Sequence, residues 1–547
     1  MATYTLRADG TAGSLAAALN GDPAVAAECL SLSGYASYGG GASPGDTFQL
    51  ADDGGDYRGT LTIVESGTSG SEYTYENYPG DTPIINGADL VSTWTVYSGS
   101  VYEAELTTQP AQIWIDGNFG DRQTSEENCI NEYDWYWASN VLYLYAPGDP
   151  DTEYTSPGVE ASIRARCIDT NGAQYVDIDG ITAQKTNQHG IDIFSSSYVT
   201  VKNCIAEWCW MVGINTYTST TVTDIVVEDC TCRYNALHGI ALAYTTGSIS
   251  NWIVRRNETY ENGKHQHAYP FWSPDQEFTA GIKAWTPLLT VSGWEIYENL
   301  CHDEGPLVGD WNTSSRGNGI WIDAVNGSDG DPIKIYHNLI YGCDGSGIFI
   351  EISNWNDVYC NVIYDCAISS WIDDPYAGGG IRVDTRIDFI VENINVYNNT
   401  ISGCYIGLQC GAYAVGSCEF NDCSFKNNVS VDSGIKNLRA QYGPDNITYG
   451  SGNVYEKNCL GAESSNFIGW GGSSYSTYDS WISASSQTDN NIESDPSFTD
   501  AGSDDYTLAS DSPCIGAAVD LGLPYNIGLL PASTWPDGVL TGDRDSY

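Results

Sequence analysis

The chain has 547 residues, and 71 acidic side chains against 21 basic ones give it a formal net charge of −50. A charge of this size and sign repels a phosphate backbone, so the composition excludes nucleic acid as a partner. No apolar run reaches about 18 residues, so the sequence predicts no membrane insertion.

The first part of the chain, residues 1–90, predicts an N-terminal cap and the first coils of a repeating β structure. Residues Leu15–Leu19 and, after a break, Ala24–Ala27 form the one strong helical pattern. Pro83–Gly87 is one of several short strands closed by turn residues. We expect the helical segment to cover the open end of the coils, because an exposed terminal strand edge invites aggregation.

The next stretch, residues 91–165, loses the repeat and is rich in aromatic residues. We interpret it as a small β module inserted between coils. The aromatic residues that mark it are Trp94, Tyr102, Trp114, Tyr133, Trp135, Tyr136, Trp137, Tyr143 and Tyr145.

An internal repeat dominates the rest, because a Gly followed by an aliphatic residue recurs nine times at intervals of 23 to 42 residues. Such a period predicts a solenoid of stacked coils over 166–440, with further coils and a closing segment over 441–547. Each aliphatic residue is expected to point inward. The nine pairs are Gly190–Ile191, Gly213–Ile214, Gly239–Ile240, Gly281–Ile282, Gly319–Ile320, Gly347–Ile348, Gly380–Ile381, Gly407–Leu408 and Gly434–Ile435.

A second periodic signal is a short strand that runs into Asn. Asn tolerates left-handed backbone angles, so we expect tight turns at these positions. The residues concerned are Asn203, Asn299, Asn338, Asn361 and Asn399.

The Gly–Ile and Asn pattern resembles the right-handed parallel β-helix of pectate-lyase-like proteins over most of the chain. Gly281–Trp285, Gly319–Asp323 and Gly347–Ser353 look like successive coils of a broad group of bacterial and phage β-helix proteins presumed to act on polysaccharides. Asp495–Phe498 and Ser512–Ile515 are also similar to that group. The resemblance implies an all-β, single-stranded right-handed parallel β-helix. It leaves both enzymes and binding proteins open, since β-helices also serve as adhesins and tailspikes.

The chain is long and its 17 cysteines are odd in number, so neither they nor their placement indicate a disulfide framework. Cys343, Cys366 and Cys404 each follow a strand aliphatic by three residues. We expect them to stack as buried, reduced thiols on successive coils. The sequence contains no Cys-x-x-Cys pair, the spacing that would suggest a metal site.

Candidate chemistry lies on the outer face of the Gly–Ile strands, because residues two and four after each Gly point away from the core. The middle coils carry the densest set of reactive and aromatic side chains. One outward column holds Lys283, Trp321, Phe349 and Arg382, and the other holds Trp285, Asp323, Glu351 and Asp384.

Neighbouring strands lie about 4.8 Å apart, so the three carboxylates would crowd one another and at least one pKa would rise. A carboxyl pair about 5 Å apart suits retaining glycoside cleavage, and a pair two coils apart, at roughly 9.5 Å, lies at the upper edge for inversion. The aromatic rings Trp285, Trp321 and Phe349 would stack on sugar faces. The alternative is a solvated salt-bridge ladder without catalytic function.

The largest insertions fall on the coils that carry these columns, at 261–280, 301–318 and 366–379. Loops on one side of a rigid scaffold commonly build a binding cleft, so Trp272 and Trp371 are further candidates for substrate binding. His302 is a candidate proton-transfer group. With Asp303 and Glu304 it could instead supply ligands for Ca²⁺, the one cofactor that the sequence leaves open.

We therefore expect a carbohydrate-active β-helix that binds and cleaves a polysaccharide around Asp323, Glu351 and Asp384. A lyase that acts on polyuronate would need cations such as Lys283 and Arg382. A chain of −50 repels polyanions, so hydrolysis of a neutral or amino-sugar polymer is favoured over β-elimination.

The alternative is a non-catalytic tailspike-like adhesin or assembly subunit that binds glycan. No apolar segment after Met1–Arg7 forms a signal peptide. The expected location is extracellular, or associated with a virion, in which case a trimer is one arrangement to consider.

Overall fold

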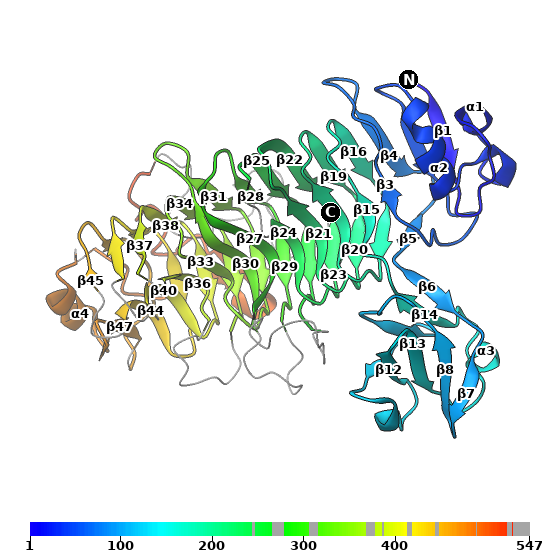
Figure 1. The fold of residues 1–547 in the computed structure, drawn as a ribbon. Coiled ribbons are helices and arrows are strands. Elements are labelled where there is room, and N and C mark those ends of the chain that lie inside the picture. Colours follow the sequence, from blue (N-terminus) through cyan, green and yellow to red (C-terminus); the bar gives the residue numbers. More distant parts are fainter. Residues whose placement is uncertain are drawn as a thin grey trace.

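The computed structural model describes residues 1–242, 247–264, 278–305, 316–367, 378–385, 388–412, 418–442, 448–465, 467–487, 490–521 and 528. Three long sheets run the length of an elongated body (Figure 1), and successive strands of the chain pass from one sheet to the next. The arrangement is the predicted parallel β-helix. Among the described residues, no helix is long and apolar enough to cross a membrane.

Sheet A carries alternating buried and half-buried side chains. In stacking order its strands are β1 (Thr3–Leu6), β2 (Thr47–Leu50), β4 (Tyr73–Asn77), β16 (Val176–Asp179), β19 (Val199–Lys202), β22 (Val222–Glu228), β25 (Ile249–Arg255), β28 (Glu295–Tyr297), β31 (Ile333–Tyr336), β34 (Asn356–Tyr359), β38 (Ile394–Tyr397), β42 (Ser424–Lys426) and β46 (Val454–Glu456).

Within the described ranges, sheet B is made of ten very short strands, each of which follows a sheet A strand after a turn. Its strands are β5 (Ile84–Asn86), β17 (Thr182–Gln184), β20 (Ile205–Glu207), β23 (Thr231–Arg233), β26 (Glu258–Tyr260), β29 (Leu300–His302), β32 (Leu339–Tyr341), β35 (Val362–Tyr364), β39 (Thr400–Ser402) and β43 (Val429–Val431).

Sheet C contains the Gly–Ile strands. They are β3 (Leu61–Thr62), β15 (Arg166–Asp169), β18 (His189–Phe194), β21 (Val212–Tyr217), β24 (His238–Leu242), β27 (Phe278–Thr290), β30 (Arg316–Asn326), β33 (Ile348–Glu351), β36 (Ile381–Thr385), β40 (Ile406–Ala412), β44 (Lys436–Tyr442), β47 (Ile468–Trp470) and β48 (Ser473–Tyr475).

The core lies between the three sheets. On sheet C, Ile282 pairs in register with Ile320, Ile320 with Ile348, and Ile348 with Ile381. All four side chains are fully buried, which confirms the register predicted from the glycines.

The last Gly–Ile pair breaks this pattern, and the prediction there is wrong. Leu408 of β40 pairs with Leu438 of β44, not with Ile435. Ile435 lies ahead of β44 and is exposed, because the chain enters this coil three residues later than the Gly suggests. Arg439 is therefore the outward partner of Gln409.

The Asn signal marks a buried ladder between sheets A and B, and the left-handed residue precedes it. Each ladder side chain donates through Nδ2 to Oδ1 of the next at 2.9 to 3.0 Å. Its members are Asn257, Asn299, Asn338, Asn361, Asn399, Asn428 and Asn458. The turn itself is made by the residue before, as at His337, where φ is 54°. Of the predicted positions, Asn203 has left-handed angles, with φ at 52°.

The cysteines behave as small apolar residues. All 17 lie in the described ranges, and all are buried and free of disulfides. Cys343, Cys366 and Cys404 each follow a sheet B strand by two residues, and those strands pair in register. The predicted stacked column of thiols is confirmed.

The N-terminal helical segment differs in detail from the prediction. Helix α1 spans Leu15–Ala18, and a short 3₁₀ turn spans Ala26–Glu28. Bridges from Tyr4 to Leu19 and from Leu6 to Leu30 lay this segment beside β1 at the end of sheet A.

Two longer helices were not predicted, because each is short and lies among Ser and Gly residues that favour loops, although each begins at a capping residue. They are α2 (Leu32–Tyr38) and α4 (Tyr478–Ser485). Ser31 accepts from the Gly34 N–H at 3.1 Å, and Thr477 accepts from the Ser480 N–H at 3.2 Å.

Two small antiparallel-rich sheets with their own core project from the body near β5 (Figure 1). Short helix α3 (Pro150–Glu153) lies in the same stretch. The strands are β6 (Ala88–Val91), β7 (Thr95–Ser98), β8 (Val101–Glu105), β9 (Ile113–Ile115), β10 (Asn118–Phe119), β11 (Asp121–Arg122), β12 (Asp134–Ala138), β13 (Val141–Tyr145) and β14 (Val159–Ser162).

The remaining strands lie toward the C-terminus. A hairpin of β49 (Phe498–Asp500) and β50 (Asp505–Leu508) packs on sheet B, where the Tyr506 ring lies 4.9 Å from Tyr364. A small three-stranded sheet combines β37 (Ile390–Glu392), β41 (Glu419–Asn421) and β45 (Thr448–Tyr449).

Candidate functional site

The predicted outward columns form on sheet C in the expected register. Lys283 pairs with Trp321, Trp321 with Phe349, and Phe349 with Arg382. The second column runs beside it, since Trp285 pairs with Asp323, and Glu351 links Asp323 to Asp384. The fold thus brings eight of the sequence-predicted site residues together on one face.

The two columns are cross-linked by charge and ring contacts. Lys283 Nζ lies 2.7 Å from Asp323 Oδ2 and 2.6 Å from the centre of the Trp321 ring. Trp321 donates through Nε1 to Glu351 Oε2 at 3.1 Å. The Trp321 ring also stacks on Phe349 at 5.8 Å.

A second ion pair lies on β36, at the other end of the two columns. Arg382 pairs with Asp384, with Nε 3.0 Å from Oδ2. The Arg382 guanidinium lies 4.7 Å from the centre of the Phe349 ring. Each of the three carboxylates therefore has a cation or an N–H donor of its own, so unpaired crowding of like charges, as the sequence predicted, does not arise.

The burial of the charged side chains is the largest difference from the prediction, which placed them at the surface. Glu351 is 3% exposed, Arg382 2% and Asp384 fully buried, and among the charged side chains of the two columns only Asp323 retains appreciable access, at 16%. The columns point away from the core of the helix, yet they are not a solvated salt-bridge ladder. Charges so placed depend on their partners, because an unpaired buried charge is costly.

His302 does not join this cluster. It belongs to β29 of sheet B, where its ring stacks between Tyr260 and Tyr341, at 4.9 Å from each. Its Nδ1 lies 2.8 Å from Asp303 Oδ2. His302 therefore lies on a different sheet from Asp323 and Glu351.

The predicted calcium ligands do not converge. Asp303 is half-exposed beside His302, whereas Glu304 is buried and accepts from the Asn262 backbone N–H at 2.8 Å. Across the described residues, no group of three or more His, Cys, Asp or Glu side chains is arranged to hold a metal ion. Trp272 and Trp371 lie outside the described residues.

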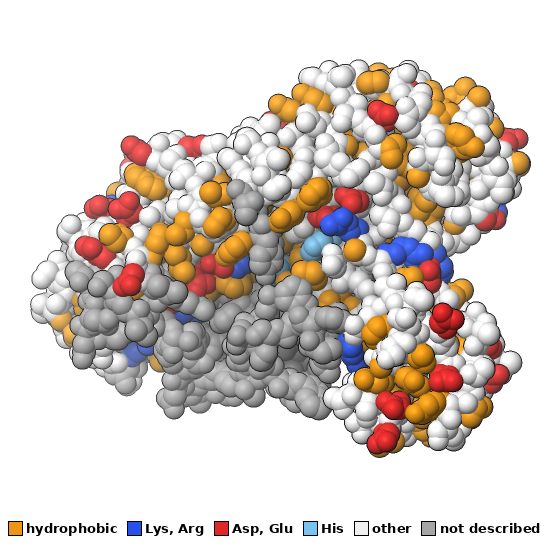
Figure 2. Space-filling model, in the orientation of Figure 1, with side chains coloured by type: hydrophobic (Ala, Val, Ile, Leu, Met, Phe, Trp, Pro, Cys, Tyr) orange, Lys and Arg blue, Asp and Glu red, His pale blue; other side chains and the backbone are white. Residues whose placement is uncertain are grey.

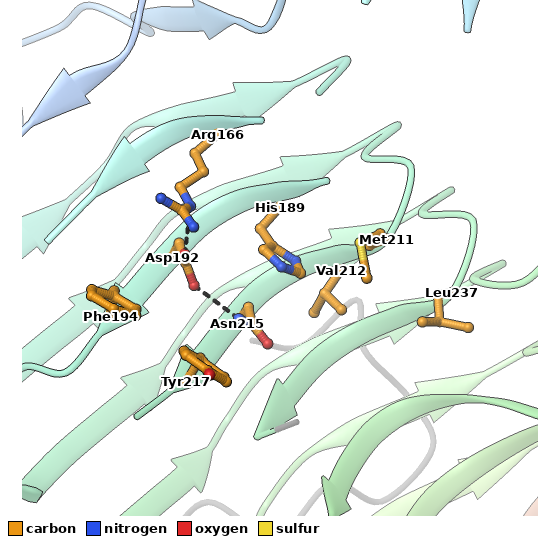
Figure 3. Close-up of a pocket in the computed structure, with 9 residues that line it drawn as sticks. All are labelled: Arg166, His189, Asp192, Phe194, Met211, Val212, Asn215, Tyr217 and Leu237. Carbon is orange, nitrogen blue, oxygen red and sulfur yellow. Dashed lines mark hydrogen bonds and ion pairs between the residues drawn. The ribbon is translucent and has the colours of Figure 1, made fainter. Parts of the chain in front are cut away.

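A pocket of about 230 Å³ opens on the same sheet, nearer the N-terminus (Figure 3). It is lined from three successive strands and the turn beyond them. The lining residues are Arg166, His189, Asp192, Phe194, Met211, Val212, Asn215, Tyr217 and Leu237. Figure 2 shows basic, acidic and His side chains gathered in this region, beside the projecting β6–β14 sheets.

The pocket is polar on one side and aromatic on the other. Arg166 lies 2.6 Å from Asp192 and 2.9 Å from Asp169. Asn215 donates to Asp192 Oδ1 at 2.8 Å. Phe194 and Tyr217 stack with ring centres 5.6 Å apart and an 11° angle between planes.

Burial changes how two of these groups ionise. It raises the pKa of Asp192 to about 6, although the Arg166 charge and the Asn215 hydrogen bond favour the carboxylate. Burial and then the charge of Arg166 lower the pKa of His189 to about 3, so this imidazole is neutral at physiological pH.

Sequence reasoning missed this pocket. Asp192 and Asn215 stand two residues after their glycines, and Phe194 and Tyr217 stand four after, so the same column rule that selected Asp323 contains them. The prediction chose the middle coils instead, because charged side chains are denser there. The available signal was an Asp and an Asn next to two aromatic residues on consecutive coils.

Part of the chain matches a known protein family. Residues 161–284 match a family model described as a right handed beta helix region. No curated protein matches the chain.

Among solved structures, a complex of XylC with xylose is similar at 14% identity and a TM-score of 0.49, covering 84% of this chain and 75% of that one. A glycoside hydrolase is similar at 11% identity and a TM-score of 0.46, covering 84% of this chain and 96% of that one. Pectate lyase Pel9A is similar at 12% identity and a TM-score of 0.44, covering 96% of this chain and 95% of that one. With its three stacked parallel sheets and its match to the family model, the chain is a right-handed parallel β-helix.

Proposed function

We propose that this protein is a carbohydrate-active β-helix that binds a polysaccharide along the outer face of sheet C and hydrolyses it with Asp323 and Glu351. The observation that carries the proposal is the in-register placement of these two carboxylates on adjacent strands. Adjacent strands lie about 4.8 Å apart. Retaining glycosidases hold their two carboxyl groups at about 5–5.5 Å.

The surroundings suggest which carboxylate does what. The Lys283 ammonium stabilises negative charge on Asp323, which suits a nucleophile that attacks the anomeric carbon. Glu351 is buried and accepts from the neutral indole of Trp321, and it is the carboxyl to which we assign proton donation. Glu351 would protonate the leaving oxygen as Asp323 forms the glycosyl ester, then accept a proton from the water that cleaves it.

The aromatic residues divide into two roles. One face of the Trp321 ring is occupied by Lys283 and the ring also stacks on Phe349, so this pair holds the charged groups in place and does not form a sugar platform. Trp285 is half-buried and in register with Asp323. It is the aromatic residue of the cluster best placed to contact substrate.

The ion pairs also favour hydrolysis over β-elimination. Elimination from a polyuronate needs a cation to neutralise the substrate carboxylate. Lys283 and Arg382 each already pair with an aspartate. Together with the net charge of −50, this favours a neutral polymer as substrate.

A second candidate is a glycan-binding protein without catalysis. The observation in its favour is the burial of Glu351, Arg382 and Asp384 and the partners that each carries. On this view the cluster stabilises the coils, and only the open part of sheet C binds sugar.

The test is a panel of neutral and anionic polysaccharides, read for new reducing ends and for unsaturated products. Asp323→Asn and Glu351→Gln should each lower turnover roughly 10²–10⁴-fold. Trp285→Ala should mainly raise KM. The matched control is Asp179→Asn, which removes a carboxylate paired with Lys202 on sheet A and should leave turnover unchanged.

Two results would contradict the proposal. Full activity in the Asp323→Asn, Glu351→Gln double variant would remove the pair from catalysis. Unsaturated product from a polyuronate would replace hydrolysis by elimination.

A further inference from the structure

The open pocket between β15 and β21 contains polar atoms without partners. Asn215 is 3% exposed, and its Oδ1 is buried without a hydrogen bond, although its Nδ2 is held by Asp192. His189 Nδ1, which lines the same pocket, is likewise buried without a partner. Buried polar atoms are normally hydrogen-bonded, so such a pair indicates a ligand or water that completes them.

The charge of the pocket selects against anions. The Arg166 guanidinium already lies between Asp169 and Asp192, and the lowered pKa of His189 leaves that ring uncharged. The groups around the pocket therefore sum to zero or to one negative charge, according to the state of Asp192. A carboxylate or phosphate ligand would find no uncompensated cation here.

The shape of the pocket suits one ring. A volume of about 230 Å³ is below the roughly 300–1,000 Å³ typical of sites for drug-sized molecules. Phe194 and Tyr217 form its aromatic side, and Figure 3 shows both rings beside Asp192 and Asn215. An aromatic surface beside hydrogen-bonding groups suits a ligand that carries both apolar C–H groups and hydroxyls.

We infer that this pocket is a binding site for one neutral pyranose unit, with the Phe194 and Tyr217 rings against the sugar and Asn215, Asp192 and His189 bonded to its hydroxyls. A hydroxyl can donate to Asn215 Oδ1 and also accept from a neighbouring group, which satisfies the unpaired atoms without adding charge. The inference stands apart from hydrolysis at Asp323 and Glu351, because it concerns binding alone and uses other residues.

The experiment is isothermal titration calorimetry of the full chain. Cellotetraose, xylotetraose and mannotetraose serve as neutral probes, and tetragalacturonate as the anionic one. We expect at least one neutral probe to bind, with a Kd about tenfold or more below that for tetragalacturonate. Asn215→Ala and Tyr217→Ala should each raise that Kd by about tenfold or more.

A matched aromatic pair provides the control. Tyr175 and Tyr198 stack at 4.3 Å outside the pocket, so Tyr198→Ala removes a stacked ring and should change Kd less than about twofold. Thermal unfolding of each variant checks the fold. If Tyr217→Ala lowers the midpoint, Tyr217→Leu keeps apolar volume without the ring and takes its place in the test.

Three outcomes would overturn the inference: no binding by any neutral probe, tighter binding of tetragalacturonate, or unchanged affinity in both pocket variants. The Asp323→Asn, Glu351→Gln double variant separates the two proposals. It should bind the neutral probe as the wild type does, whether or not the wild type releases reducing ends.

Discussion

Glu304 offers a direct test of the structure through the pH dependence of stability. It follows β29 and is 1% exposed, and its carboxyl accepts from the Asn262 backbone N–H at 2.8 Å and from Asn262 Nδ2 at 3.2 Å. Burial raises its pKa to about 8, against hydrogen bonds from Thr259 and Asn262 that favour the charged form. The change to make is Glu304→Gln, which removes the charge and keeps the shape.

The magnitude follows from the difference between the folded and unfolded states. The unfolded pKa is near the ordinary 4.5 and the folded one is about 8. At about 1.36 kcal/mol per pH unit, the full difference is about 5 kcal/mol as an upper value. The folded state keeps a proton that the unfolded state has lost, so this stabilisation is fully present below pH 4.5 and is lost as the pH rises through about 8.

Chemical denaturation at about pH 5 and about pH 9 measures the effect. The wild type should lose up to about 4 kcal/mol more than Glu304→Gln over this interval, which spans about three of the pH units below the folded pKa, because all other titrating groups are common to both. The variant should be the more stable protein at the higher pH. Equal losses in the two proteins would show that Glu304 is already charged in the fold and would refute the reasoning.

A matched buried glutamate has the opposite environment. Burial opposes the charge of Glu160, but hydrogen bonds and charges of Lys185 and Arg58 outweigh it and hold its pKa below 4.5. Its contribution to stability is therefore constant above pH 4.5 and falls only in acid. Glu160→Gln should destabilise equally at both pH values, which separates a charge effect from a loss of hydrogen bonds.

Two further predictions concern the core. Ile348→Asp should lower stability by several kcal/mol, since it buries an unpaired charge between coils, whereas Ile390→Asp, at a position 47% exposed, should change the unfolding midpoint little; equal losses would contradict the register. Cys343, Cys366 and Cys404 should react slowly with a thiol reagent in the native state and fully after denaturation, and rapid labelling without denaturant would show that the column is not closed.

Much of the fold was readable from local chemistry. A Gly beside each inward aliphatic residue fixed the register of Ile282 through Ile381, because a one-residue slip would turn every apolar side chain outward. The same rule failed at Gly434. Three residues intervene there between the Gly and Leu438, the residue that pairs with Leu408, and a Gly cannot show how long the chain runs before the inward position is reached.

The candidate site shows a different limit. Alternation along a strand tells which side chains leave the core, and it correctly aligned Asp323 with Glu351. It carries no information on what then covers them. That is why Glu351 and Arg382, expected at the surface, are buried, and why the open pocket around Asp192 was passed over for a cluster with more charge.

The pocket and the carboxylate pair lie on one line across sheet C. From Asn215 the register passes through Ala241 and Lys283 to Trp321, which is three strand spacings or about 14 Å. A pocket with room for one ring cannot span that distance. A molecule that contacts both places must therefore extend along the stack, perpendicular to the strands, over several units. The stacking of coils thus aligns single-residue columns along the axis of the body, which is the geometry that the proposed polysaccharide ligand requires.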